Sequence, residues 1–272
     1  MFKYLILDDD NISLVETIKA GPAPKDPGSI KVLPLDLNDL ESVKSAAASF
    51  AQQETKLDVL WNNAGTGALG VEGFEAMIGM HCVAAQLFTY LLLHQLRAAG
   101  STTDLKGSVR VVCASSFLGG ASSPTNGIEF DVLDKGTPDR TRNYAVSEVG
   151  NWVLSKEMAL RYGAEGIVSV TRNPGNLKAG SYAGTPALAM FFINPLLHEP
   201  KFGGYTELYA GLSPDISLEN TGAYVIPWGL FRPDEDCPGK DILKALKSEA
   251  EGGLGYAIKL WHWCEEQWRP YI

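Results

Sequence analysis

Tyr144 and Glu148 stand four residues apart in the segment NYAVSEVGN, a spacing that can support proton chemistry. The pattern of the surrounding residues predicts a helix over 143–162, and positions i and i+4 of a helix face the same way. A carboxylate beside a phenol favours the protonated phenol, so we expect the pKa of Tyr144 to be raised. Tyr144 is then suited to donating a hydrogen bond and poorly suited to acting as a base.

The elements that must position these residues alternate along the chain. Apolar runs predict strands at 3–7, 29–35, 57–61, 108–115 and 166–172, and helical patterns cover 12–20, 39–54, 74–99 and 143–162. Apolar strands separated by helices predict a parallel sheet covered on both faces. We therefore expect a doubly wound α/β fold forming a single domain, 1–272.

Two further segments complete this prediction. The stretch at about 176–220 is rich in glycine, proline and aromatic residues, and we expect a helical lid over a cleft there. The alternative is an insertion that packs on the body of the domain. The tail YAIKLWHWCEEQW is expected to form an amphipathic helix docked on the domain.

Composition narrows the class of protein. The 272 residues are 45% hydrophobic and 20% charged, with a net charge of −9. This is typical of a globular protein, and the acidic balance disfavours binding to nucleic acid or anionic membranes. The four cysteines lack metal-ligand spacing, no apolar run is long enough to span a bilayer, and the start does not read as a signal peptide. We expect a cytoplasmic protein with no metal and no membrane span.

A glycine pattern in the chain needs separate treatment. GTGALG (65–70) follows a predicted strand and satisfies G-x-G-x-x-G. A dinucleotide fingerprint opens the first βα unit and has an acidic residue about 20 residues further on, whereas here that position falls inside the helical run LFTYLLLH. We therefore reject this segment as a phosphate-binding loop.

Several other motifs resemble the short-chain dehydrogenase/reductase family, in the family's order, from about residue 29 to the C-terminus. WNNAG (61–65) is similar to its Asn-Asn-Ala-Gly signature, and VVCASSFLGG (111–120) to its strand ending in the catalytic serine. NYAVSEVGN resembles its Tyr-x-x-x-Lys helix, and NPGN (173–176) its Pro-Gly turn beside the nicotinamide. GIEFDVLD, PGNLKAG and YTELYAGLSPDISLENTGAYVIPWG further resemble fungal members close to the retinol-dehydrogenase and WW-domain-oxidoreductase branch.

The resemblance implies a Rossmann-like fold, with catalytic roles for Ser116 and Tyr144. It also implies contacts to a dinucleotide. We regard the following positions as vestigial candidates for those contacts: Asp36, Asn63, Ala64, Gly65, Pro174 and Gly175.

The chain departs from the family pattern at three points. The family opens with a strand and a glycine-rich turn that holds the pyrophosphate, whereas this chain begins at what resembles the second strand. His81 stands where the family's catalytic asparagine falls, and Glu148 replaces the lysine that holds the ribose and lowers the tyrosine pKa. If the two helices meet as in the family, His81 and Glu148 become neighbours able to move protons, with Ser116 and Tyr144 donating to an oxyanion or enolate.

Each residue also has a plainer interpretation. His81 could be a packed helix histidine. Glu148 could face solvent, or could hold a ribose and preserve cofactor binding. Ser116 and Tyr144 could be relics in an inactive pocket.

The departures lead to a main hypothesis and two alternatives. The main hypothesis is a cofactor-independent enzyme that isomerises, cyclises (pericyclic closure included) or dehydrates a hydrophobic small molecule in fungal secondary metabolism. The first alternative is a divergent NAD(P)-dependent oxidoreductase acting on a carbonyl or alcohol, with NADP or NAD as cofactor. The second is a non-catalytic pseudoenzyme. Because the helices with His81 and Tyr144 form the dimer face in many relatives, we expect a homodimer or homotetramer. With the family's first strand absent, segment 3–7 must shift inward or a partner chain must cover the gap.

Overall fold

The computed structural model describes residues 4–7, 20–21, 25, 28–65, 75–178 and 187–272. Its main sheet has five strands in the order β3 (Val59–Asn62), β4 (Val109–Ala114), β5 (Ile167–Arg172), β6 (Tyr224–Ile226) and β7 (Leu230–Phe231). The first four are parallel, and β7 runs antiparallel to β6. The predicted strands near 57–61, 108–115 and 166–172 are confirmed.

The two N-terminal strands form a sheet of their own. β1 (Tyr4–Leu7) pairs in parallel with β2 (Lys31–Pro34), in a register that sets Tyr4 opposite Lys31. Among the described strands, β1 pairs with β2 alone and β3 with β4 alone. The expectation that segment 3–7 shifts into the main sheet is therefore wrong, because the ladder hydrogen bonds of β1 go to β2.

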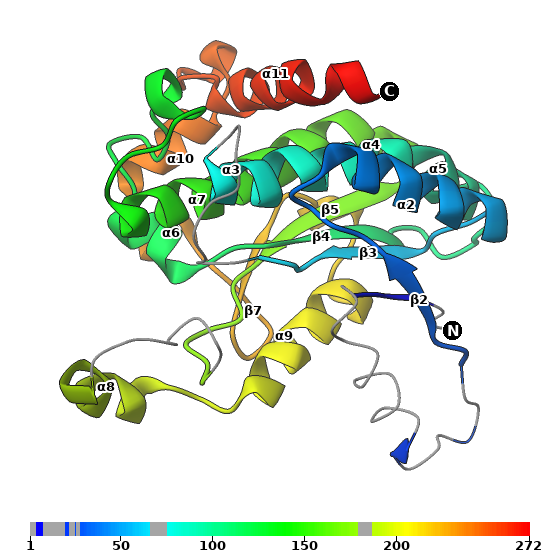
Figure 1. The fold of residues 1–272 in the computed structure, drawn as a ribbon, viewed down its shortest axis with the longest axis horizontal. Coiled ribbons are helices and arrows are strands. Elements are labelled where there is room, and N and C mark those ends of the chain that lie inside the picture. Colours follow the sequence, from blue (N-terminus) through cyan, green and yellow to red (C-terminus); the bar gives the residue numbers. More distant parts are fainter. Residues whose placement is uncertain (1–3, 8–19, 22–24, 26–27, 66–74, 179–186) are drawn as a thin grey trace.

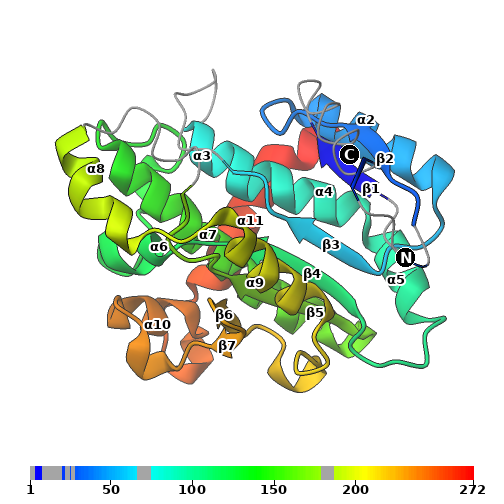
Figure 2. The same ribbon diagram turned by 90° about the horizontal axis from the view of Figure 1, so that it is seen from below.

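Helices cover both faces of the main sheet (Figures 1 and 2). The upper layer in Figure 1 contains α2 (Leu40–Gln53), α4 (Ala85–Leu91), α5 (Leu93–Gly100), α7 (Arg140–Tyr162) and α11 (Tyr256–Trp268). The main apolar core lies under this layer. On the other face α9 (Pro200–Leu212) packs against β3 to β6. The arrangement is a Rossmann-like, doubly wound α/β fold, as predicted.

Local sequence signals explain where two of these helices begin. Asp39 caps α2 by accepting a hydrogen bond from the backbone N–H of Glu41, and Asp139 caps α7 by accepting from Thr141 and Arg142. Such caps satisfy N–H groups that have no partner inside the helix. The predicted helices 39–54 and 143–162 and the tail helix are confirmed. The predicted helix 12–20 lies outside the described residues apart from Ala20.

The long helix predicted over 74–99 is broken into pieces. It consists of α3 (Ala76–Ile78), a π-helical turn η2 (Gly79–Ala84), α4 and, after Leu92, α5. In the part of the chain that the structure describes, no single helix has the length and apolar character to cross a membrane. The pieces before and after Leu92 satisfy that test only when joined, with a bend of 54° between them.

The remaining elements are short. They include α6 (Phe117–Ser122), α8 (Ala187–Ile193), α10 (Lys240–Leu246) and several 3-10 turns. Strands β6 and β7 were not predicted from the sequence, because three and two residues give too little pattern to detect. The predicted lid segment contains α8 and also α9, which covers the second face of the sheet. Its role as a lid stays a prediction.

Candidate active site

Three parallel strands deliver polar residues to one edge of the sheet. β3 ends at Asn62 and leads into the exposed segment Asn63–Gly65, while β4 leads to Ser116, which caps α6. β5 leads into the turn Asn173–Gly175. In a doubly wound sheet, ligands bind outside these carboxyl ends. The edge is therefore the place for a functional site.

Two glycines let α7 come close to its neighbours. A Cβ on Gly119 of α6 would lie 3.3 Å from the Cβ of Glu148, so α6 and α7 are in near contact there. A Cβ on Gly150 would lie 2.5 Å from Cys82 Sγ, so the missing side chain at this position lets η2 pack closely on α7. These contacts bring Ser116 and His81 toward the helix that carries Tyr144 and Glu148.

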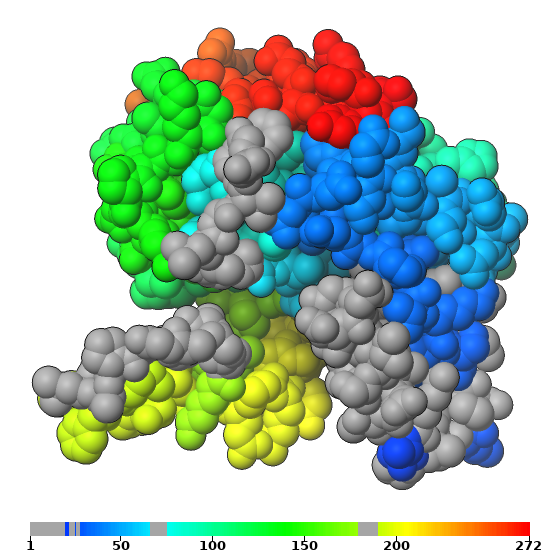
Figure 3. Space-filling model, in the orientation of Figure 1, coloured from blue at the N-terminus to red at the C-terminus, as the bar shows by residue number. Residues whose placement is uncertain are grey.

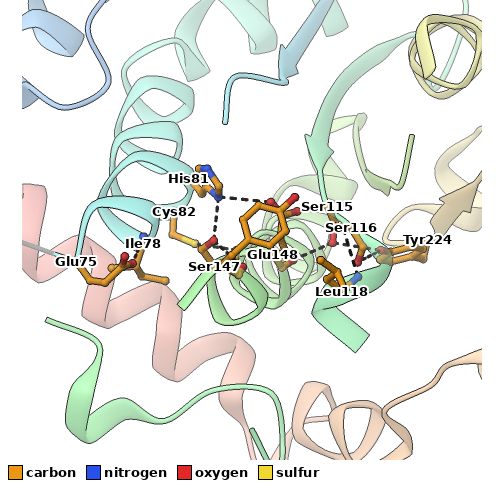
Figure 4. A network of polar contacts seen from close by, with 11 residues as sticks. Glu75, Ile78, His81, Cys82, Ser115, Ser116, Leu118, Ser147, Glu148 and Tyr224 are labelled. Carbon is orange, nitrogen blue, oxygen red and sulfur yellow. Dashed lines mark hydrogen bonds and ion pairs between the residues drawn. The ribbon is translucent and has the colours of Figure 1, made fainter. Parts of the chain in front are cut away.

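The π-helical turn η2 places His81 inside the protein. The imidazole is almost completely buried, and its Nδ1 lies 2.9 Å from Ser147 Oγ and 3.5 Å from Glu148 Oε1. Figure 4 shows His81 directed at Ser147 and Glu148. The His81 and Tyr144 rings meet edge to face at 6.2 Å. π-turns are frequent at functional sites because they re-aim one side chain of a helix.

The hydroxyl of Ser147 bears on the tautomer of His81. The Ser147 hydroxyl donates to the backbone carbonyl of Tyr144 at 2.9 Å. A hydroxyl has one hydrogen, so when Ser147 donates to Tyr144, its Oγ accepts from His81 Nδ1. The other nitrogen, Nε2, faces Gly65, where an added Cβ would lie 3.0 Å away. His81 therefore links the interior of α7 to the exposed segment after β3.

Tyr144 and Glu148 form the polar centre of the site. Burial raises the pKa of the Glu148 carboxyl to about 7, although the hydrogen bond from Tyr144 and the charge of Arg172 oppose the rise. Burial, and then the Glu148 charge, raise the pKa of the Tyr144 phenol well above its ordinary value, while a hydrogen bond to Ser116 lowers it. The predicted direction for Tyr144 is confirmed. The Glu148 carboxyl can hold a proton at neutral pH.

A buried cation stands behind this pair. Arg172, at the end of β5, forms an ion pair with Glu207 of α9 and donates a hydrogen bond to Asn63 Oδ1. Arg172 is buried and Glu207 largely so, and the pair ties α9 to the exposed segment after β3. On the other side of Glu148, the hydroxyl of Ser115 donates to the Glu148 backbone carbonyl at 2.9 Å, and Tyr224 donates to Ser115 Oγ (Figure 4).

An open cavity of about 260 Å³ lies beyond the carboxyl ends of β4 and β5. It begins at Phe117, the residue after Ser116, and is walled by the turn Asn173–Leu177, the start of α9 and the hairpin tip at Pro227 and Trp228. In Figure 3 the yellow α9 segment lies below the green side of the body. The cavity therefore lies beside the Ser116 end of the site.

The structure brings together most of the residues selected from the sequence. His81, Ser116, Tyr144 and Glu148 lie in one network. The solvent-facing alternative for Glu148 is wrong, because its side chain is buried, whereas the buried His81 is compatible with the packed-histidine alternative. Asp36 lies apart from it, exposed after β2, where its carboxylate accepts hydrogen bonds from Asn38. Most of GTGALG lies outside the described residues.

Sequence reasoning missed two groups of residues. Ser147 and Arg172 are the first, and a cluster of aromatic rings at the cavity is the second. Arg172 carried a usable signal, because an arginine at the carboxyl end of a buried strand needs a partner. Ser147 carried none, because only the packing of η2 on α7 makes it a neighbour of His81.

Comparison with known proteins identifies the class. No family model matches the chain. It is 41% identical over 262 residues to the short-chain dehydrogenase/reductase iacJ of Pestalotiopsis fici, covering 94% of this chain and 78% of that protein. It is 37% identical over 259 residues to the short-chain dehydrogenase/reductase bet4 of Neocamarosporium betae, covering 92% and 73%. The chain belongs to the short-chain dehydrogenase/reductase family and is similar to its fungal members.

Solved structures share the fold. A Pseudomonas aeruginosa RhlG/NADP active-site complex superposes with a TM-score of 0.61 at 18% identity, covering 83% of this chain and 84% of that one. An NADPH-bound carbonyl reductase from chicken fatty liver gives a TM-score of 0.58 at 17% identity, covering 82% and 84%. At these identities the likeness concerns the fold alone.

The hypothesis of a cofactor-independent isomerase, cyclase or dehydratase is wrong, and so is the expectation that no cofactor is used. The relatives along nearly the whole chain are named dehydrogenase/reductases, which supports the NAD(P)-dependent alternative. The physical error was to treat Glu148 as a fixed negative charge. With a pKa of about 7, its carboxyl is neutral in a large fraction of molecules at neutral pH.

The described residues fit the nicotinamide end of a dinucleotide. Asn63, Ala64 and Gly65 are exposed after β3, and Pro174 and Gly175 form the turn after β5. Glu148 stands where the resemblance places a ribose-holding side chain, but its carboxyl is buried and engaged by Tyr144, so the exposed groups after β3 and β5 are the ones that can reach a sugar. This chemistry suits an amide and sugar hydroxyls.

Proposed function

We propose that this chain is an NAD(P)-dependent short-chain oxidoreductase that interconverts a carbonyl group and an alcohol on a hydrophobic small molecule in fungal secondary metabolism. The observation that carries the proposal is the 41% identity to a fungal short-chain dehydrogenase/reductase over 94% of the chain. The hydrogen-bonded hydroxyls of Ser116 and Tyr144 support the same chemistry.

Proton donation is assigned to Tyr144. A bound nicotinamide dinucleotide supplies the hydride for reduction of the carbonyl carbon. Tyr144 donates its phenol proton to the carbonyl oxygen, and Ser116 donates a hydrogen bond to the same oxygen. Because its pKa is raised, the Tyr144 phenol stays protonated at neutral pH and is present in the form that can donate.

Glu148 is the second proton carrier. Below about pH 7 its carboxyl is protonated next to Tyr144, and a phenolate formed at Tyr144 takes that proton because its pKa is higher. Glu148 then regains a proton from water. His81 helps to position the carboxyl, since its Nδ1 lies 3.5 Å from Glu148 Oε1. The substrate gains one proton per turnover, and each residue returns to its starting state.

Direct titration of the purified 272-residue chain with NADPH and NADH, followed by nicotinamide fluorescence, tests the proposal. We expect micromolar binding, about −8 kcal/mol, of at least one of them. With a hydrophobic ketone at pH 6, NADPH absorbance should then fall in proportion to alcohol formed. No binding of either dinucleotide up to millimolar concentration would overturn the proposal.

A pair of tyrosine variants locates the chemistry. Tyr144→Phe should lower turnover by about 10²- to 10⁴-fold, the usual contribution of a positioned acid, while dinucleotide binding stays within a few fold. Tyr90→Phe, an exposed tyrosine on α4, is the matched control and should leave turnover unchanged. Equal rates in the two variants would move the proton donor elsewhere.

A further inference from the structure

Three aromatic side chains form one wall of the cavity. His198 and Trp228 lie 5.4 Å apart at 89°, Phe202 and Trp228 lie 5.3 Å apart at 66°, and His198 and Phe202 lie 6.2 Å apart at 80°. We call these three residues the ring wall. The rings meet edge to face, which is a favourable arrangement for aromatic pairs. Trp228 remains 62% exposed, so part of its surface is free to contact a ligand.

The backbone holds the ring wall in place. The N–H of His198 donates to Asn176 O at 2.8 Å, and the N–H of Lys178 donates to His198 O at 2.9 Å, forming a short bridge. Phe202 sits in the first turn of α9, which begins at Pro200. A ring wall fixed in this way loses little conformational entropy when a ligand binds.

Trp228 occupies a conformation that a bulky residue rarely adopts. It lies between β6 and β7 in the tip Pro227–Gly229, with φ of 73°, and Gly229 follows with φ of 69°. Glycine fits such a position without strain, whereas a bulky side chain there costs on the order of 1–3 kcal/mol. The tip is pressed against its neighbours: a Cβ on Gly175 would lie 2.8 Å from Pro227, and one on Gly229 would lie 3.0 Å from the ring of Tyr209. The large indole is therefore kept at a position where the turn by itself favours glycine.

The chemistry of the lining selects among ligand classes. None of the described residues that line the cavity carries a carboxylate. A cation already lies near Phe202, because Lys201 Nζ is 5.4 Å from its ring centroid and forms an ion pair with Glu199. Both facts disfavour a cationic ligand. Asn173 Oδ1 is already engaged by the N–H of Gly175 at 2.9 Å, so much of the remaining contact surface is apolar.

We propose that the ring wall of His198, Phe202 and Trp228 recognises an apolar ring system in the substrate, with the indole of Trp228 as the main contact surface. This rests on the proposed function, and it names the substrate class as ring-bearing apolar ketones and their alcohols. A cavity of about 260 Å³ is smaller than the roughly 300–1,000 Å³ of sites for drug-sized ligands, so it holds one ring portion of the substrate.

The test measures binding without turnover. Isothermal titration of the full chain with 1-(2-naphthyl)ethanol, in the absence of dinucleotide, is compared with 2-butanol. We expect the naphthyl alcohol to bind at least tenfold more tightly. Trp228→Phe should weaken its binding by less than about threefold, because the ring remains, and Trp228→Gly by more than tenfold. Leu160→Ala, an exposed apolar position on α7 outside the cavity lining, is the control and should change nothing.

Thermal unfolding separates recognition from folding. Trp228→Gly relieves the positive φ, so its unfolding midpoint should stay at or above that of the Phe variant although binding is lost. Equal naphthyl affinity in wild type, Trp228→Phe and Trp228→Gly would overturn the proposal, as would equal affinity for the two alcohols. If binding depends on Trp228 but no NAD(P)H-linked turnover is found, ring recognition is upheld and only the proposed oxidoreductase function is contradicted. If turnover is found but binding does not depend on Trp228, the oxidoreductase function is upheld and ring recognition is contradicted.

Discussion

His81 Nδ1 lies 3.5 Å from Glu148 Oε1, and the two side chains are only 1% and 8% exposed. A carboxyl so far from water resists ionisation, and its pKa rises to about 7 despite the nearby Tyr144 hydroxyl and Arg172. Several groups from packed elements face it: His81 and Cys82 on η2, Tyr144 on α7, Arg172 on β5 and Tyr224 on β6. The protonation state of Glu148 therefore links stability and catalysis to pH.

Stability should fall with pH through Glu148. Its folded-state pKa of about 7 exceeds the ordinary value of 4.5, so protonated Glu148 contributes stability that is complete below about pH 4.5 and lost as pH rises through 7. Glu148→Gln removes this loss. The unfolding free energy of the variant minus that of the wild type should therefore be about 3 kcal/mol larger at pH 8 than at pH 4.5. Urea unfolding at both pH values measures it, with exposed Glu266→Gln as control. If the difference in unfolding free energy between variant and wild type is the same at the two pH values, the raised pKa of Glu148 is contradicted.

Catalysis should follow the same group. In the proposed carbonyl reduction, kcat/KM is expected to decline as pH rises through about 7, because ionised Glu148 can no longer return a proton to Tyr144. Glu148→Gln should have a lower rate below pH 7 and a profile without this inflection. The profile from pH 5.5 to 9 is the measurement. A wild-type inflection that persists in the Gln variant would assign it to another group.

The contact of η2 with α7 should be intolerant of any side chain at position 150. A Cβ there would lie 2.5 Å from Cys82 Sγ, so Gly150→Ala is expected to cost about 1–3 kcal/mol through overpacking. Gly204→Ala on α9 is the matched control, since nothing lies within 4 Å of the added Cβ, and it should be neutral or stabilising by up to about 1 kcal/mol. Adding Cys82→Ala to Gly150→Ala should recover part of the loss. Chemical unfolding of the four proteins provides the comparison.

The buried ion pair between Arg172 and Glu207 should matter more than an exposed one. Arg172→Met leaves the Glu207 carboxyl buried without its partner, and we expect a loss of about 3–5 kcal/mol. Arg97→Met breaks the exposed pair with Glu165 and should cost no more than about 1 kcal/mol. Similar losses in the two variants would show that the Arg172 pair contributes no more than a surface contact. Differential scanning calorimetry of both variants decides between these outcomes.

Much of this architecture could be read from local patterns. Continuous apolar runs predicted strands β3, β4 and β5, and the i, i+4 spacing of Tyr144 and Glu148 placed both on one side of α7. The motif resemblance led to the family to which the chain belongs. These features depend on neighbours in the sequence, so the sequence carries them directly. The expected homodimer or homotetramer stays a prediction.

Other features depend on contacts between distant segments. The pKa of Glu148 follows from burial under η2 and α6, and the sequence interpretation went wrong when it assumed a fixed charge there. The contact of His81 Nδ1 with Ser147 Oγ joins residues that are 66 positions apart in the chain. The ring wall combines His198 and Phe202 with Trp228, from a strand pair too short to predict. The residue types and their order determined the fold and the family, whereas desolvation and packing across the fold decided which groups hold a proton and what the cavity can bind.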